Sequence, residues 1–430
     1  MNMNSKEYSI LKTNTNPTLS IYNSLTKKVE VFKPRNSKEV KMFSCGPSIY
    51  RKPHIGNYRT FIYEDIFQRY LEYLGYNVTR LMNFTDIEDK AIEEAKMKGV
   101  TVKELTKKIA DIFHDEIKLL NIKSPTYIVR STETVDDAIK ILTKLIERGY
   151  AYYYKDDIYF DPTKFNGFGK LYGLDMSRWP EKKIRFKRDN YSNNVWNLGD
   201  FILWHACKDE NYPCWDAPIG RGWPAWNVQD PAIIIHSLGN KVDICCGGID
   251  NRLMHHDYNI AIMESFSGVE FCPYWLHGHH LFVDGKKMSK RKGNILYVED
   301  LIKKGYSTQE IRFFLIYSQY RQRMNFTLTK FERTSKKLNE FVEMINYLLI
   351  KNNSKESSSD VSILLDEMSK SFEMHMGNDL NVKNAFDSIF EIISKLYLIK
   401  KKGKLSDKDS EILLNKLYKI DNVLKVIFTN

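Results

Sequence analysis

CGPSIYRKPHIGN, residues 45–57, joins two segments of different hydrophobic periodicity. The segment before it, KEVKMF at 38–43, alternates like a short β-strand, and residues 58–76 after it carry apolar and aromatic side chains at helical spacing. The sequence therefore predicts a strand that ends at Ser44-Cys45, a Gly-Pro turn, and a helix that begins near His54-Ile55-Gly56-Asn57.

This predicted junction of a strand and a helix is a place where open α/β sheets bind ligands. The free backbone amides at a helix N-terminus attract phosphate groups. We expect the thiol of Cys45 and the imidazole of His54 to face the crevice that such a junction forms.

Size and composition describe a globular protein of several domains. The chain has 430 residues, which suits two to four domains, and its composition is 43% hydrophobic and 28% charged. The net charge of +11 suits a polyanionic partner such as nucleic acid, although many basic proteins have none. Six scattered cysteines without a CxxC pair predict reduced thiols in a cytoplasmic protein. No apolar run approaches the ~20 residues of a membrane span, so no membrane partner is expected.

The first half of the chain alternates predicted strands and helices. The expected elements are a hairpin at 19–32, a strand at 77–87, helical structure at 89–120 with a break near Gly99, a strand at 126–130 and a helix at 134–150. From about 150 to 220 the chain becomes aromatic and rich in turn residues, which indicates an insertion within an α/β domain.

The α/β pattern resumes after this insertion. The expected elements are a strand and turn at 241–250, a helix at 255–266, a strand at 274–285 and a basic loop at 286–294. From about Asp300 the pattern is helical throughout, with a polar linker at 351–360.

Two short motifs, HIGN at 54–57 and KMSK at 287–290, carry the chemistry. The histidine can hydrogen-bond a phosphate, the glycine lets a ligand approach the backbone, and the lysines can clamp a polyphosphate. Each motif alone is weak, because a single histidine is usually structural and a basic loop is usually solvated. Their occurrence together, in this order and at opposite ends of an interrupted α/β pattern, is much more specific.

In this combination the chain resembles the class I aminoacyl-tRNA synthetases and, within that class, the cysteinyl-tRNA synthetases. The resemblance covers the chain from about residue 19 onward. Further segments that support it are FSCGPSIY (43–50), NFTDIEDK (83–90), DFILW (200–204), CWDAPIGRGWPAWN (214–227), GGID (247–250), HHDYNIA (255–261) and NDLN (378–381).

The resemblance implies an α/β fold, with a Rossmann-like nucleotide-binding domain, an inserted connective subdomain and an α-helical bundle. The implied divisions are the first half of the catalytic domain at 19–150, the connective insertion at 151–222, the second half with the KMSK loop at 223–298, a stem-contact junction at 299–340 and a helical tRNA-binding bundle at 341–430.

The resemblance also implies the reaction. ATP, with Mg²⁺, and L-cysteine would form cysteinyl-adenylate and pyrophosphate, and the cysteine would pass to the terminal ribose of tRNA-Cys, in a cytoplasmic monomer. The implied catalytic residues are His54, Asn57, Lys287 and Lys290. The implied ATP-binding residues are Gly46, His54, Gly56, Asn57, Gly247, Gly248, Asp250, Lys287, Met288, Ser289 and Lys290.

The chain departs from the family's pattern at three places in this nucleotide site. Asn57 stands where the family more often has a second histidine, a swap that keeps a hydrogen-bond donor. Arg291 stands where a second serine is usual. Cys245-Cys246 replace a His-Gly pair, so the adenosine pocket is expected to differ in detail.

Cysteine selection in the family rests on zinc, which binds a thiolate and not the isosteric hydroxyl of serine. The resemblance places the metal ligands at Cys45, Asp230, His255 and Asn259. Asp230 replaces a second cysteine and Asn259 replaces a glutamate, so two of four ligands are retained. His256 and Cys246 are candidate substitutes. The alternative is that no zinc binds and that these are ordinary pocket residues.

The amino-acid pocket implied by the resemblance contains Cys45, Thr85 and Trp226, with the indole as a wall. The histidines of HGHH at 277–280 are expected along one strand, so that one faces away from the other two.

Two other functions compete with the ligase. One is a tRNA-independent cysteine ligase that acts on a small amine, and the helical C-terminal part argues against it. The other is a non-catalytic paralogue that binds tRNA or nucleotide. The altered zinc ligands favour this paralogue slightly, whereas the retained His54, Gly56, Lys287 and Lys290 argue against it.

Overall fold

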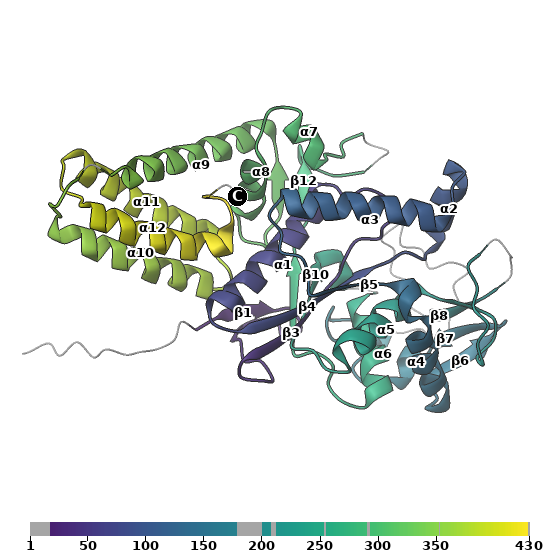
Figure 1. The fold of residues 1–430 in the computed structure, drawn as a ribbon. Helices are drawn as coiled ribbons and strands as arrows, with labels where there is room; N and C mark the ends of the chain where they lie inside the picture. Colours follow the sequence, from purple (N-terminus) through teal and green to yellow (C-terminus); the bar gives the residue numbers. More distant parts are fainter. Residues whose placement is uncertain are drawn as a thin grey trace, which may run out of the picture.

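A computed structural model describes residues 18–178, 200–207, 212–252, 255–289, 293–351 and 353–428. At its centre lies a five-stranded parallel sheet (Figure 1). The strands are, in spatial order, β11 (Tyr274–Gly278), β10 (Ile244–Gly248), β3 (Glu39–Ser44), β4 (Asn77–Phe84) and β5 (Tyr127–Arg130). The strand order reverses beside β3, so a crevice is expected at the carboxyl ends of β3 and β10. The α/β fold expected from the sequence is confirmed.

Helices cover both faces of this sheet. One face packs on α1 (Ile55–Tyr73) and α3 (Val102–Leu119), and the other packs on α5 (Trp226–Leu238) and α6 (His256–Ser267). Alternate residues of a strand point to opposite faces, so Cys246 joins the core on the α1 side and Cys245 joins the core on the α5 side. The break expected near Gly99 separates α2 (Asp89–Lys98) from α3.

The expected insertion contains a second, antiparallel sheet. Its strands are β6 (Ala151–Tyr154), β7 (Asp157–Phe160), β8 (Phe201–Ala206) and β9 (Gly222–Pro224), and its core is shared with α4 (Val135–Glu147). Cys207 and Cys214 form a disulfide just after β8. The expectation of reduced thiols is wrong for this pair, because the fold brings the two side chains together. The other four cysteines are free and buried.

The strand predicted at 274–285 is two strands. β11 ends at Gly278, and β12 (Leu281–Val283) pairs instead with β13 (Lys286–Lys287) and β14 (Met324–Phe326). A Cβ at Gly278 would lie 2.6 Å from the ring of Tyr63, so the chain leaves the central sheet where a helix crowds it. The histidines of HGHH therefore do not share one strand, since only His277 belongs to β11.

The C-terminal part is a helical bundle (Figure 1, left). It follows α7 (Val298–Ile302) and α8 (Thr308–Ile316) and consists of α9 (Leu328–Leu349), α10 (Ser359–Gly377), α11 (Val382–Lys401) and α12 (Asp407–Leu424). The expectation of helix throughout is wrong at β14, which pairs with β12. Helix α9 crosses the implied division at 340, so the five divisions remain predictions. Among the described helices none is long and apolar enough to cross a membrane.

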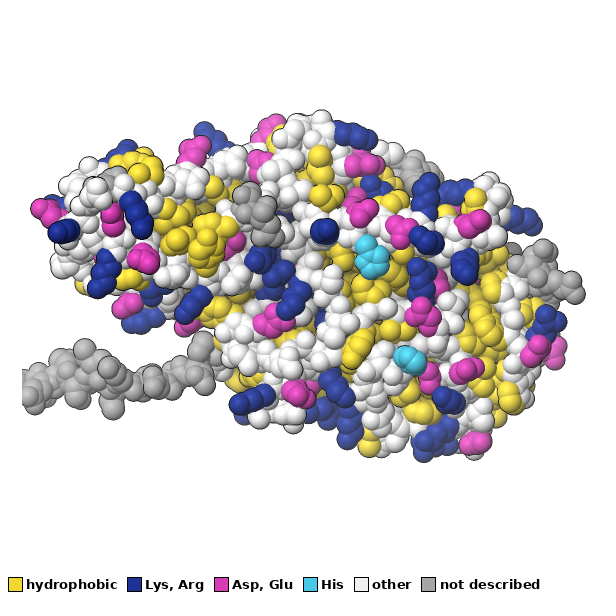
Figure 2. Space-filling model, viewed as in Figure 1, with side chains coloured by type: hydrophobic (Ala, Val, Ile, Leu, Met, Phe, Trp, Pro, Cys, Tyr) yellow, Lys and Arg dark blue, Asp and Glu magenta, His cyan; other side chains and the backbone are white. Residues whose placement is uncertain are grey.

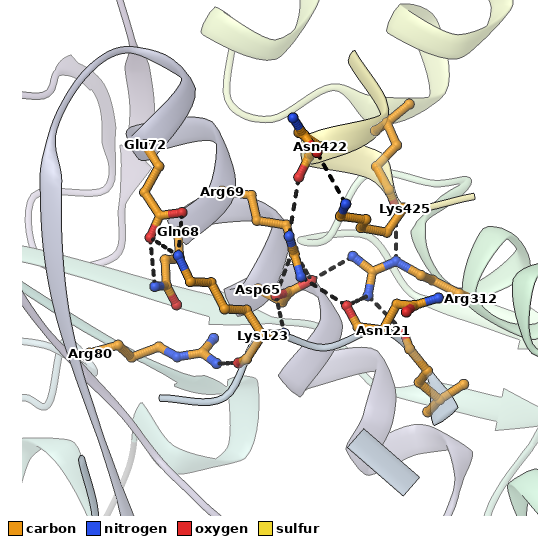
Figure 3. Close-up of polar contacts among 12 residues, drawn as sticks. Asp65, Gln68, Arg69, Glu72, Arg80, Asn121, Lys123, Arg312, Asn422 and Lys425 are labelled. Atoms are coloured by element: carbon orange, nitrogen blue, oxygen red, sulfur yellow. Dashed lines mark hydrogen bonds and ion pairs between the residues drawn. The ribbon is translucent and has the colours of Figure 1, made fainter. Parts of the chain in front are cut away.

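A buried charged cluster fastens the bundle to the sheet domain (Figure 3). The carboxylate of Asp65 on α1 accepts hydrogen bonds from Arg69 and from Arg312 of α8. Arg312 also donates to the carbonyl oxygens of Leu120 after α3 and Leu424 at the end of α12, at 2.9 Å and 2.7 Å. Asp65 and Arg312 are fully buried, so one ion pair joins four helices.

Lys and Arg side chains lie over both the bundle and the sheet domain on the face seen in Figure 2, with Asp and Glu side chains between them. On this face the basic charge is not gathered into one patch, so charge alone does not mark a nucleic-acid track.

Candidate active site

The predicted start of α1 is confirmed, and His54 is its N-cap. The imidazole Nδ1 accepts hydrogen bonds from the backbone amides of Gly56 (3.1 Å) and Asn57 (3.3 Å). The side-chain oxygen of Asn57 accepts one from the amide of His54 at 3.0 Å, which completes a capping box. Asn57 thus helps to cap the N-terminus of α1, besides any contact that it makes with a ligand.

The protonation of His54 follows from this cap. Burial lowers its pKa, with Lys287 acting in the same direction and Asp250 opposing it, so the imidazole is neutral at neutral pH. Because Nδ1 accepts hydrogen bonds, the single proton must lie on Nε2. This N–H can donate to an anionic oxygen beside the helix N-terminus, where phosphate is favoured.

The start of the KMSK loop lies against the start of α1. A Cβ at Gly56 would lie 2.7 Å from Cε of Met288, so a larger residue there would displace the end of this methionine. Asn294 holds the loop, because its side chain accepts from the amide of Ser289 at 3.0 Å and donates to the carbonyl of Lys287 at 3.3 Å. Lys290 and Arg291 lie outside the described residues.

A crevice of about 510 Å³ opens at the carboxyl ends of the central strands. Of the residues expected at the site, the structure places Cys45, Gly46, His54, Asn57, Thr85, Trp226, Gly248, Asp250 and His255 along its walls. Gly247 is not among the residues that line this crevice. Its amide and its carbonyl both form hydrogen bonds with the hydroxyl of Tyr63. Residues from β3, α1, β4, α5 and β10 therefore converge on one cavity.

Asn83 at the end of β4 organises the floor of this crevice. Its Oδ1 accepts from the amide of Gly46 at 2.7 Å, and its Nδ2 donates to Asp230 Oδ1 at 2.8 Å. The sequence did not assign Asn83 a role, although a polar residue at the carboxyl end of a buried strand is a signal for one. A Cβ at Gly46 would lie 1.9 Å from the carbonyl oxygen of Asn83, so glycine permits this approach.

We expect Gly46→Ala to lower the free energy of unfolding by about 1–3 kcal/mol and to weaken binding of cysteine, the substrate that the sequence resemblance implies, because the loop must move away from Asn83. Urea unfolding and cysteine titration measure these effects. Gly75→Ala is the control: Gly75 has a left-handed backbone (φ 90°) but open space around it. This variant should lose some stability and keep cysteine binding. Equal cysteine binding in both variants would contradict the prediction.

The thiol of Cys45 lies within a group of metal-binding side chains. One ligand atom from each of Cys45, His255 and His256 lies within 4.8 Å of the others. Cys45 Sγ is 2.9 Å from His256 Nε2 and 3.9 Å from Asp230 Oδ2, and His255 Nε2 is 2.7 Å from the same carboxylate oxygen. Asn259 directs its Nδ2 at Asp230 Oδ2 (3.4 Å).

This donor set fits a zinc ion. A thiol, two imidazoles and a carboxylate are the ligand types that zinc prefers. Two buried atoms of the group, His255 Nδ1 and Asn259 Oδ1, have no hydrogen-bond partner. The candidate substitute Cys246 packs in the core on the α1 side of the sheet, whereas His256 contacts the thiol directly.

The electrostatics of the group fit the same ion. Burial, and then the charge of Asp230, raises the pKa of Cys45 well above its ordinary value, so the thiol is neutral unless a cation is bound. Burial, helped by His277 and His255, lowers the pKa of His256 well below its ordinary value, and a neutral imidazole is the form that binds metal.

A second layer of side chains orients His256. Its Nδ1 lies 2.8 Å from His277 Nε2, and His277 Nδ1 lies 2.8 Å from the hydroxyl of Ser24. When both Nδ1 atoms carry the protons, these two hydrogen bonds leave Nε2 of His256 unprotonated. This nitrogen can then accept a hydrogen bond or bind a cation. No sequence signal points to Ser24, because it belongs to a hairpin distant in sequence.

Trp226 forms one wall beside this group. It is the first residue of α5, and Asp230 follows one turn later, so the two share a helix face. Its ring stacks on His255 with centroids 5.3 Å apart. The indole of Trp226, the thiol of Cys45 and the imidazole of His255 thus line the same crevice, with the buried Asp230 behind them.

Comparisons with known proteins agree with this geometry. The family described as the catalytic domain of class I (C) tRNA synthetases matches residues 31–337. The chain is 36% identical to a cysteine–tRNA ligase of Chlamydia pneumoniae over 418 residues, which are 95% of this chain and 86% of that relative. It is 37% identical to a cysteine–tRNA ligase of Brachyspira hyodysenteriae over 376 residues, 86% of this chain and 79% of that one.

A solved structure supports the fold. The methionyl-tRNA synthetase of Mycobacterium tuberculosis bound by methionyl-adenylate aligns with a TM-score of 0.66 and 15% identity. The alignment covers 90% of this chain and 92% of that one. The similarity in structure extends over the sheet domain and the bundle together.

Proposed function

The chain belongs to the class I tRNA synthetases, in the family of the cysteine–tRNA ligases, and we propose that it activates L-cysteine with ATP and transfers it to tRNA-Cys. The observation that carries this proposal is that the capped His54 and the metal-binding group at Cys45 line one crevice. This arrangement suits an adenylate intermediate, because its phosphate and its amino-acid side chain belong to one molecule and would be bound in one crevice.

In the first step a carboxylate oxygen of cysteine attacks the α-phosphorus of ATP. A new O–P bond forms, the bond to the bridging oxygen breaks, and pyrophosphate leaves with the electron pair. The Nε2–H of His54 donates to a phosphate oxygen as charge develops, and Lys287 and Lys290 neutralise the leaving pyrophosphate. A Mg²⁺ ion that accompanies ATP would add positive charge there. Gly248 and Asp250, which line the crevice, hold the adenosine together with Gly247.

In the second step a hydroxyl of the terminal ribose of the tRNA attacks the carbonyl carbon of cysteinyl-adenylate. An ester forms and AMP leaves. We propose that the protein is a monomer and that the bundle from α9 to α12 contacts the tRNA.

Zinc would be held by Cys45, His255 and His256, with Asp230 beside them, and would supply a site that binds the cysteine thiolate and rejects the serine hydroxyl. Shape alone would separate such isosteres only ~10–200-fold. The distances favour His256 over Asn259 as the ligand that replaces the family's glutamate.

Cysteine-dependent exchange of pyrophosphate into ATP tests the first step, and charging of a tRNA-Cys transcript tests the second. We expect exchange with cysteine and not with serine, and charging of the transcript. Exchange without charging would favour a ligase that acts on a small amine. Absence of exchange with every amino acid would favour a non-catalytic paralogue.

We expect His54→Ala to slow exchange by ~10²–10³-fold, because it removes a donor to the transferring phosphate. It should also lower the free energy of unfolding by ~1 kcal/mol, because it removes the N-cap. His54→Asn separates the two roles, since asparagine caps helices well but does not reach as far. Stability near that of the wild type with slow exchange is the expected result. Fast exchange by His54→Asn would contradict the donor role.

A further inference from the structure

The NDLN segment at 378–381 forms the turn between α10 and α11 and lies far from the crevice in sequence. Asp379 in this turn adopts a left-handed backbone (φ 57°) and is only 3% exposed. A buried aspartate in this conformation requires partners that hold it there.

The carboxylate of Asp379 binds the segment 319–321 on the sheet domain. Its Oδ1 accepts from the hydroxyl of Tyr320 at 2.8 Å and from the amide of Tyr22 at 2.9 Å. Its Oδ2 accepts from Arg321 Nε at 2.6 Å and from the side-chain amide of Gln319 at 3.2 Å. Four donors thus converge on one side chain of the bundle.

The same segment is fastened to α1, the helix that His54 begins. Arg59 is buried and donates to the carbonyl oxygens of Gln319 (3.2 Å), Gln322 (2.8 Å) and His279 (3.1 Å). The ring of Tyr320 stacks on the ring of Tyr63, with centroids 5.0 Å apart and planes 20° from parallel.

Tyr63 in turn holds the backbone of Gly247. Its hydroxyl donates to the carbonyl of Gly247 at 2.9 Å and accepts from the amide of the same residue at 3.1 Å. Gly248 and Asp250, which follow at once, line the crevice. A continuous series of contacts therefore leads from the bundle turn through Tyr320 and Tyr63 to the end of β10.

We propose that Asp379 is a positioning residue for the nucleotide, which acts through Tyr320 and Tyr63 to hold the segment 247–250 in its ATP-binding conformation. The proposal rests on the proposed function, which places adenosine at this segment. It goes beyond that function by making the attachment of the bundle part of the ATP site.

A purely structural role for Asp379 predicts a different result. If the carboxylate only fastened the bundle, its loss would lower stability and leave the affinity for ATP unchanged. If it positions the segment 247–250, its loss raises the KM for ATP and the dissociation constant of ATP, and it leaves the KM for cysteine unchanged.

The test compares Asp379→Asn with Asp387→Asn in the full-length protein. Asparagine keeps the size of the side chain and tolerates a left-handed backbone, but it loses the charge that pairs with Arg321 and turns one acceptor into a donor. Asp387 is the matched control, because it also accepts from a tyrosine hydroxyl, that of Tyr317, and pairs with Lys337 and Lys383.

Calorimetric titration with ATP alone, without cysteine or tRNA, is the first measurement. We expect Asp379→Asn to weaken ATP binding by about threefold to thirtyfold, the range of coupling through contiguous contacts, and Asp387→Asn to leave it within twofold. In cysteine-dependent exchange the KM for ATP should rise by the same factor at an unchanged KM for cysteine.

Tyr63→Phe, which keeps the ring and removes the hydroxyl, tests the route. It should weaken ATP binding as Asp379→Asn does, and the double variant should be no weaker than the weaker single one, because both changes release the same segment. Unchanged ATP binding in Asp379→Asn, or full additivity in the double variant, would overturn the inference and leave the proposed function standing. A wild-type protein that fails to bind ATP would overturn the proposed function, and the inference with it.

Discussion

Asp65→Ala is expected to lower the free energy of unfolding by about 3–5 kcal/mol. The substitution removes the carboxylate that pairs with Arg312, and both side chains are fully buried. Burial alone would raise the pKa of Asp65, but Arg312 and Arg69 hold it below its ordinary value, which shows that the native state favours the charged carboxylate. Without it, the guanidinium of Arg312 remains as a buried charge with only carbonyl partners.

The control for this prediction is Asp111→Ala. Asp111 pairs with Lys107 at 2.8 Å one turn away, but both side chains are exposed, so its loss should leave stability nearly unchanged. Midpoints of urea unfolding at constant slope compare the two variants. The double variant Asp65→Leu/Arg312→Met should recover much of the loss, because it removes both buried charges. Equal effects of Asp65→Ala and Asp111→Ala would refute the role of this pair.

The junction at residues 45–57 could be predicted because its signals are local. An alternating run and a histidine before helical periodicity need no distant contact to be interpreted, and the structure confirms the strand and the start of the helix. The turn expected at Gly46-Pro47 lies instead at residues 49–50, because Ser48 forms a β-bridge with Thr85. The break between α2 and α3 is likewise local, since it depends on the left-handed backbone at Gly99.

The features that the sequence did not predict depend on distant contacts. The strand at 274–285 divides because Tyr63 of α1 lies against Gly278 and the carbonyl of Tyr320 accepts from the amide of His279 at 2.8 Å. The disulfide between Cys207 and Cys214 depends on how the inserted sheet folds. Neither contact leaves a periodic signal in the sequence.

The group of side chains around Cys45 could be predicted in part from local spacing, and the rest of it depends on distant contacts. His255, the N-cap of α6, and Asn259, one turn into the helix, both direct their side chains to Asp230, as their spacing of four residues predicts. Which neighbour reaches Cys45 depends on the placement of α6 against β3, and the structure selects His256. Helical spacing alone does not contain that information.

Cys45→Ser is expected to lower kcat/KM for cysteine at least ~100-fold in pyrophosphate exchange, with an unchanged KM for ATP. The hydroxyl of serine is a poor ligand for zinc, so the metal that would bind the substrate thiolate is lost. Preference for cysteine over serine should fall with it. Metal analysis of the purified proteins should find about one zinc per chain in the wild type and far less in the variant.

Cys272→Ser is the control, because Cys272 is buried in the same hydrophobic cluster and its thiol donates to the carbonyl of Tyr274 at 3.2 Å, a bond that serine can replace. It should keep zinc and activity.

A second comparison tests which side chain completes the zinc site. His256→Gln should lower zinc affinity by at least ~10–100-fold, whereas Asn259→Ala should retain the metal. Zinc retained by Cys45→Ser would refute the role of Cys45 as a metal ligand. An intact preference for cysteine in a zinc-free variant would refute selection by the metal, because only a cation that prefers sulfur separates the substrate thiolate from the isosteric hydroxyl.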